Sequence, residues 1–179
     1  PVRLLVCDFR GDELRGYVDF DAERIAALGP NPSLEELFGA RKAGSYLAVT
    51  FDLANGNGRY QGIVPLEGPG LASAVQGYFT QSEQVPTLIR VAIAAEAGHS
   101  RAAGMLVQHL PEGEEGRERL HTRFDHPEWE HVATLAGSLR ADELLAPELS
   151  LDAIVWRLFH EEEEVRVFAG PPIARGCRC

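Results

Sequence analysis

Strand-like segments occur in pairs along this chain of 179 residues, and that pairing constrains the fold more than any other feature of the sequence. The pairs are residues 2–9 with 14–20, 46–53 with 59–66, and 85–95 with 102–110. Each pair is joined by a short polar or glycine-containing segment. Connections this short join antiparallel neighbours, because parallel strands need a crossover of about a dozen residues or more. The sequence therefore predicts a series of β-hairpins.

Helical patterns lie between and after these pairs. Ser33 and Glu36 form a capping box that predicts a short helix, and Pro127 suits the first position of another. The clearest helix begins after Ser150, where the apolar residues recur at helical spacing: Leu151, Ile154, Val155, Leu158 and Phe159. Residues 164–168 alternate like one more strand. We therefore predict an α+β fold, with antiparallel sheets built from hairpins and packed helices in a single core domain.

Composition excludes several classes of partner. The formal net charge of -10 argues against binding to a nucleic-acid backbone, which requires clustered Lys and Arg. No run of eighteen apolar residues is present, so no membrane association is expected. Three cysteines do not form the even set of a small secreted domain. A reducing compartment, the cytoplasm, is therefore the expected location.

Two cysteines close the sequence, at Cys177 and Cys179. Two thiolates at this spacing can supply one edge of a zinc tetrahedron, and Arg175 and Arg178 favour the thiolate form. The chain holds no second cysteine pair to complete that site, so a terminal tail with incidental thiols remains an alternative interpretation. Cys7 lies in an apolar strand, where a small buried thiol is expected.

Three histidines and two glutamates lie within eleven residues: His121, His126, Glu128, Glu130 and His131. His126 and His131 are five positions apart, which does not match the His-Glu-x-x-His spacing of zinc hydrolases. The cluster is also explained without a metal, as polar residues on a surface helix and on the loop that leads into it. A metal-dependent hydrolase that uses His126, His131 and nearby acids is nevertheless kept as an alternative function.

Several segments, taken together, resemble the redox-regulated heat-shock chaperones known as the thirty-three-kilodalton chaperonins. The resemblance covers almost the whole chain, and its landmarks are residues 59–62, 66–68, 78–87, 103–108, 154–163 and 177–179. It implies that residues 1–170 are a chaperone core domain and that residues 171–179 begin the linker and zinc-binding segment. Relative to that family the chain lacks the helical region before the first strand and everything after Cys179.

The resemblance also implies a function. In that family Cys-x-Cys and a distant Cys-x-x-Cys bind one zinc when reduced, and oxidants convert the pairs to disulfides and release the metal. The resulting ATP-independent holdase binds unfolding client proteins and is not an enzyme. Carried over, Cys177 and Cys179 are the first half of the zinc and redox site, with zinc bound only when the downstream pair is present. Unpaired strand edges allow a homodimer with swapped elements. A passive interaction domain is the remaining alternative.

Overall fold

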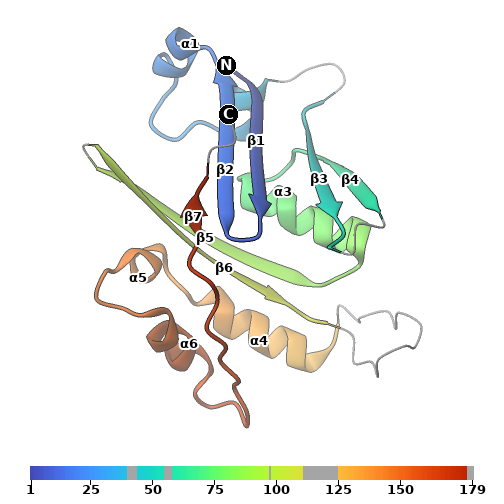
Figure 1. Cartoon of the computed structure of the whole chain (residues 1–179), viewed down its shortest axis with the longest axis vertical. Helices are drawn as coiled ribbons and strands as arrows, with labels where there is room; N and C mark the ends of the chain where they lie inside the picture. The colour runs from blue at the N-terminus through green and yellow to red at the C-terminus, as the bar shows by residue number, and fades with distance from the viewer. Residues whose placement is uncertain (40–43, 55–57, 97, 111–124, 177–179) are drawn as a thin grey trace. The chain divides into compact units, whose positions relative to one another are not determined.

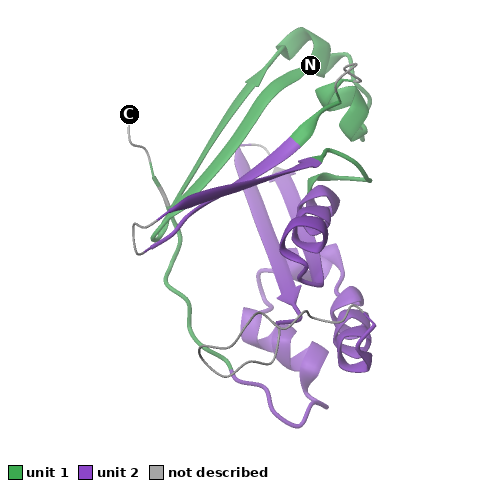
Figure 2. Cartoon of the chain, turned by 90° about the vertical axis from the view of Figure 1, so that its right-hand side faces the viewer, with its two compact units in different colours: residues 1–46, 65–71, 167–179 green, residues 47–64, 72–166 purple. Residues whose placement is uncertain are grey.

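The structure is a computed structural model, and it describes residues 1–39, 44–54, 58–96, 98–110 and 125–176. The chain divides into two compact units, coloured separately in Figure 2. Unit 1 comprises Pro1–Tyr46, Pro65–Leu71 and Val167–Cys179, and unit 2 comprises Leu47–Val64 and Ala72–Arg166. The proposed boundary between residues 170 and 171 is not tested by this division and stays a prediction.

Unit 1 is built on the first predicted hairpin. Strands β1 (Val2–Arg10) and β2 (Glu13–Phe20) pair antiparallel, and Gly11 in the turn has a φ of +65° that suits glycine. A register shift interrupts β1 between Val2 and Leu4, whereas β2 pairs without interruption. The short strand β7 (Ala174–Arg175) adds to the other edge of β2 in parallel orientation (Figure 1). This parallel pair is the one departure from the antiparallel pairing expected for the described strands.

Two short helices complete the described secondary structure of unit 1. Helix α1 spans Ala22–Ala26, and the side chain of Asp21 caps it by accepting a hydrogen bond from the Arg24 amide. Helix α2 spans Leu34–Phe38, and the capping box predicted from Ser33 and Glu36 is present in both directions. Two orphan amide groups at the helix start are satisfied in this way, which confirms the local prediction.

One part of unit 2 packs around a buried tyrosine. Strands β3 (Tyr46–Asp52) and β4 (Arg59–Pro65) form a two-stranded sheet, and helix α3 (Leu71–Tyr78) runs into a π-helical turn, η1 (Phe79–Glu83). The ring of Tyr78 is fully buried, and a β-carbon built on Gly62 would lie 2.2 Å from it. Burial, and then the hydrogen bond to Glu83, raise the pKa of Tyr78. Only glycine fits at position 62 beneath this ring.

The other part of unit 2 is a long hairpin with helices on one face. Strands β5 (Thr87–Glu96) and β6 (His99–Gln108) pair antiparallel, and helices α4 (Pro127–Gly137), α5 (Ala141–Leu145) and α6 (Leu151–Phe159) follow. Figure 1 shows these helices on the same side of the hairpin. The core between them contains Ala92, Leu139, Leu144, Ile154 and Leu158. The apolar stripe predicted for the last helix is confirmed in part: Ile154 and Leu158 are in the core and Phe159 packs against it, whereas Leu151 is 70% exposed.

The described residues confirm the mixed α+β class and correct two local predictions. Residues 164–168 form no strand, although Val165 and Val167 alternate with charged residues. Cys7 is exposed rather than buried, and its neighbours on the same strand face, Leu5, Phe9 and Val18, are exposed as well. The turn at residues 55–57 and the loop predicted at residues 112–123 lie outside the described residues.

Candidate functional site

One face of the β1–β2 hairpin is apolar and open to solvent. Side chains alternate across a strand, so residues 5, 7 and 9 of β1 share a face with residues 14, 16 and 18 of β2. We call this set the hairpin face: Leu5, Cys7, Phe9, Leu14, Gly16 and Val18. Phe9 is 56% exposed, and Leu5, Leu14 and Val18 are also exposed. Adjacent exposed apolar side chains of this kind mark an interaction surface.

The opposite face of the hairpin is held by ion pairs. Arg3 Nε donates to Asp19 Oδ2 at 2.8 Å, and Arg15 Nε donates to Asp8 Oδ2 at 2.9 Å. The hydrogen bond from Arg3 lowers the pKa of Asp19 below its ordinary value. Charged groups on this side are thus paired across the strands, whereas the hairpin face carries no charge. The opposite face therefore combines paired charges with the exposed side chains of Leu4, Val6 and Tyr17, whereas the hairpin face is uncharged.

The segment that leads into the terminal cysteines is attached to this hairpin. The Ala174 amide donates to the Asp12 carbonyl at 2.8 Å, and the Gly176 amide donates to the Leu14 carbonyl at 3.1 Å. A β-carbon on Gly176 would lie 3.1 Å from the Glu13 side chain, so glycine permits this close approach. Cys177 and Cys179 themselves lie outside the described residues. Their role as a zinc and redox half-site stays a prediction.

Unit 2 has a second open apolar surface. Ala92 faces the helices, so the odd-numbered residues of β5 face the other way together with their partners on β6. On this outer face of β5–β6, Ile93 is 71% exposed, and Val91 and Leu106 are exposed as well. Sequence reasoning missed both open faces, because an apolar strand residue that faces solvent has the same one-dimensional pattern as one that faces a core.

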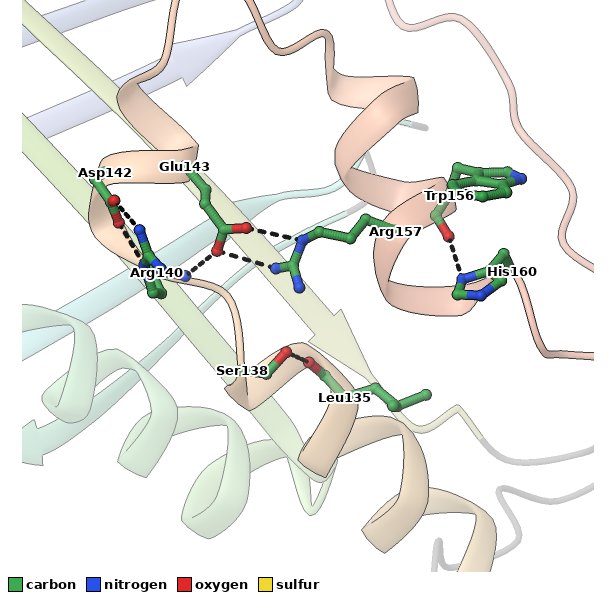
Figure 3. Close-up of polar contacts among 8 residues, drawn as sticks. All are labelled: Leu135, Ser138, Arg140, Asp142, Glu143, Trp156, Arg157 and His160. Atoms are coloured by element: carbon green, nitrogen blue, oxygen red, sulfur yellow. Dashed lines mark hydrogen bonds and ion pairs between the residues drawn. The ribbon is translucent and has the colours of Figure 1, made fainter.

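Helix α6 carries an exposed aromatic pair and an ion pair to α5. Trp156 is 68% exposed and stacks on His160 with ring centroids 4.6 Å apart. Glu143 accepts the Arg140 amide at the start of α5 and pairs with Arg157 of α6 at 2.9 Å (Figure 3). The ion pair joins the two helices, and the Glu143 side chain in it is only 18% exposed. Trp156 and His160 are landmarks of the chaperone resemblance, and here both lie at the surface.

The histidines proposed as metal ligands have separate surroundings. His131 Nε2 lies 2.7 Å from Glu162 Oε1, whereas the His126 ring lies 5.2 Å from the ring of His109 and its Nδ1 lies 3.9 Å from Glu128. His109 was not singled out from the sequence. In the part of the chain that the structure describes, no three His, Cys, Asp or Glu residues converge as metal ligands. His121 lies outside that part.

No helix among the described residues has the length and apolar character needed to cross a membrane.

Comparison with known proteins decides the family. The model of the family described as Hsp33 protein matches residues 1–179. The chain belongs to the Hsp33 family. It is similar to the 33 kDa chaperonin of Caulobacter vibrioides, with 36% identity over 187 residues, and to that of Ectopseudomonas mendocina, with 39% identity over 182 residues. All of this chain is covered in both alignments, but only 58% and 55% of the relatives. The chain thus spans somewhat more than half the length of these relatives.

A solved structure supports the fold. The 33 kDa chaperonin (Heat shock protein 33 homolog) of Thermotoga maritima superposes with a TM-score of 0.62 at 22% identity, covering 94% of this chain and 53% of that one. The similarity confirms the α+β architecture of the Hsp33 family. The relatives' name describes a chaperone rather than an enzyme.

The landmark segments of the sequence have structural roles in this fold. Gly62 and Tyr78, from two separate landmarks, are packed against each other. Ile154 and Leu158, from a third, are buried in the core beneath β5 and β6. These four landmark residues therefore have packing roles, whereas Trp156 of the same segments lies at the surface. The surfaces that could bind another protein are the open faces described above.

Proposed function

We propose that this protein is an ATP-independent holdase that binds unfolding proteins during oxidative stress in the cytoplasm and catalyses no reaction of its own. The observation that carries the proposal is the open, uncharged hairpin face, on a chain whose relatives are named chaperonins. Unfolding proteins expose apolar side chains that have lost their core. A surface of exposed Leu, Val and Phe can bury those side chains without recognising a particular sequence.

The binding free energy expected from burial of the hairpin face suits a client that must be released again. Burial of apolar surface contributes roughly 25 cal/mol per Å². A face of a few side chains therefore gives modest affinity per contact, and binding needs neither a nucleotide nor a closed pocket. The outer face of β5–β6 adds a second surface of the same chemistry in unit 2. Extended, flexible clients can use either surface or both.

The redox part of the proposal concerns Cys177 and Cys179. In the reduced protein they would supply two of the four thiolates that a tetrahedral zinc site requires, with a downstream cysteine pair supplying the others. Peroxide oxidises two thiols to one disulfide: the S–S bond forms, the O–O bond breaks, and two waters carry away the protons. The disulfide no longer offers two thiolate ligands. Because structural zinc contributes about 10 kcal/mol or more to folding a small module, its loss would unfold the segment beyond β7.

Association of two protomers is a further part of the proposal. In the described sheet of unit 1, β1 pairs with β2 alone, and an unpaired strand edge can pair with a strand of another chain. Light scattering coupled to size-exclusion chromatography, run before and after peroxide, measures the mass. A monomer at all concentrations and in both redox states contradicts this part.

Aggregation of a heat-unfolded test enzyme, followed by light scattering without ATP, tests the holdase function. We expect this chain to suppress aggregation at near-stoichiometric ratios. The variant Phe9→Asp places a charge on the hairpin face beside Leu14 and should abolish most of the suppression. If the unaltered chain and the full-length protein, reduced or oxidised, leave aggregation unchanged, the proposed function is wrong.

A further inference from the structure

We propose that the edge of β2 around Gly16 and Val18 takes up an extended segment of the client as an added β-strand. The inference rests on the holdase function proposed above and specifies where the client binds and in what conformation. It differs from burial on the open faces, because here the main contacts are hydrogen bonds between backbones.

The first observation is that this edge already accepts a strand. Strand β7 pairs with β2 through the Ala174 and Gly176 amides, which donate to the carbonyls of Asp12 and Leu14 at 2.8 and 3.1 Å. The pairing covers only Glu13 and Leu14 of β2. The edge is thus shown to have the geometry for strand addition, and β7 uses only its beginning.

The second observation is the direction of the remaining backbone groups. The Leu14 carbonyl points towards β7, and backbone groups alternate in direction along a strand. The amides and carbonyls of Gly16 and Val18 therefore point to the same edge, whereas those of Arg15 and Tyr17 point towards β1. Within the described residues, no other strand pairs with β2 at this edge. Four backbone groups in a row are placed to bond an incoming strand.

The third observation is that β2 lacks the features that normally block strand addition. Residues 13–20 contain neither Pro nor Lys, and β2 pairs with β1 without a bulge of its own. Of its three charged residues, Glu13 lies beside β7, and Arg15 and Asp19 belong to the opposite face, where they pair with Asp8 and Arg3. The edge is therefore open both sterically and electrostatically.

The side chains next to this edge suit an apolar strand. Leu14 and Val18 flank Gly16 on the hairpin face, and both are more than 40% exposed. Gly16 has no side chain, and its nearest neighbour outside the adjacent residues is the Val6 carbonyl at 3.7 Å from a built β-carbon. An incoming strand can place its alternate apolar side chains beside Leu14 and Val18. The added strand then extends the hairpin face rather than covering it.

An unfolded client fits this edge better than a specific partner does. Strand addition derives its affinity from main-chain hydrogen bonds, which every non-proline segment can form, and specificity comes only from side-chain pockets. The cavity of about 190 Å³ in unit 1 is lined by Val2–Leu5, Phe38 and residues 44–46, so it contains no residue of this edge and cannot select side chains there. The site therefore selects for an extended, unpaired backbone, the property that unfolding proteins share.

Hydrogen exchange of individual amides provides the test, with reduced and carboxymethylated α-lactalbumin, which stays unfolded, as the probe. On addition of the probe, we expect the amides of Gly16 and Val18 to exchange at least about tenfold more slowly, while those of Arg15 and Tyr17 change little. Val18→Pro removes one edge amide without removing a hydrogen bond to β1, and should weaken probe binding about tenfold. Val18→Thr keeps the amide and the β-branched shape and should bind within about threefold of the unaltered chain.

The outcomes separate this inference from the holdase function. If the probe binds and aggregation is suppressed, but Gly16 and Val18 gain no protection and Val18→Pro binds normally, strand addition is wrong and the holdase function stands. Protection that grows with protein concentration in the absence of probe assigns the edge to a second copy. If the Gly16 and Val18 amides are protected without probe at every protein concentration, the chain's own tail occupies this edge. Either of these two results overturns the inference. Failure of the probe to bind at all contradicts both proposals.

Discussion

The two long hairpins of this protein are built alike but surrounded differently. Strands β5 and β6 have helices α4, α5 and α6 on one face, with Ala92 buried among the helix side chains. Strands β1 and β2 expose Leu5 and Phe9 on one face and Leu4 and Tyr17 on the other. An isolated hairpin is at best marginally stable in water. The comparison teaches that the described core lies in unit 2, while the β1–β2 hairpin leaves apolar side chains exposed on both faces.

The largest expected contrast comes from the same substitution in each region. Leu158→Ala removes a buried side chain of the α6 core and should cost about 2–5 kcal/mol of unfolding free energy. Leu5→Ala trims an exposed side chain of the hairpin face and should cost less than about 1 kcal/mol. Urea unfolding of both variants measures the difference. Equal losses would mean that Leu5 is buried in solution and that the hairpin is not an open surface.

Two glycines extend the comparison to backbone packing. Gly62→Ala places a β-carbon 2.2 Å from the ring of Tyr78, which is fully buried and has no room to move. Overpacking of this kind should cost about 1–3 kcal/mol. Gly16→Ala meets nothing closer than 3.7 Å, and should be neutral or stabilising by about 0.5–1 kcal/mol. Thermal unfolding distinguishes the two; a stable Gly62→Ala variant would contradict the packing between β4 and α3.

Local chemistry was predictable from the sequence, and burial was not. Ser33 and Glu36 are three residues apart, so their reciprocal bonds follow from spacing alone. Cys7 was expected inside a core, because its apolar neighbours indicate burial whenever a second layer exists. That layer depends on contacts between distant segments, which one sequence does not specify. Strand β7 was missed as a partner of β2 for the same reason, since two residues carry no periodic signal.

The candidate site was also predictable only in part: the cysteine pair was found from the sequence, and the hairpin face was not. Cys177 and Cys179 stand out by their spacing, and the family resemblance that they completed is confirmed. The hairpin face has no comparable signal, because Leu5, Leu14 and Val18 look like ordinary core residues until their exposure is known. Functional surfaces made of apolar side chains are for this reason harder to predict than sites made of cysteines or charges.

A smaller effect is expected where β7 joins the hairpin. Gly176→Val places a side chain against Glu13, which a β-carbon would already approach to 3.1 Å, and should detach β7 from β2. The amide of Ala174 should then exchange about tenfold faster, while global stability changes by less than about 0.5 kcal/mol. Gly170→Val is the matched control, because nothing lies within 4 Å of a β-carbon there. Unchanged exchange at Ala174 in the Gly176 variant would mean that glycine is not required for the strand pairing.

The smallest expected effect concerns two ion pairs between neighbouring strands: Arg3 with Asp19 on β1–β2, and Arg59 with Asp52 on β3–β4. Arg3 lowers the pKa of Asp19 from its ordinary value of 3.8, so the stabilisation is present above that pH and is lost as pH falls through the lower folded value. Asp19→Asn should therefore lower the urea midpoint slightly at pH 6, and this difference should disappear as the pH falls through the lowered pKa of Asp19. Asp52 pairs with Arg59 in unit 2, but its side chain is 67% exposed compared with 36% for Asp19. Because exposure to solvent screens an ion pair, Asp52→Asn should have the smaller effect at every pH. A larger loss from Asp52→Asn than from Asp19→Asn would contradict this order and show that solvent exposure does not set the strength of the two ion pairs.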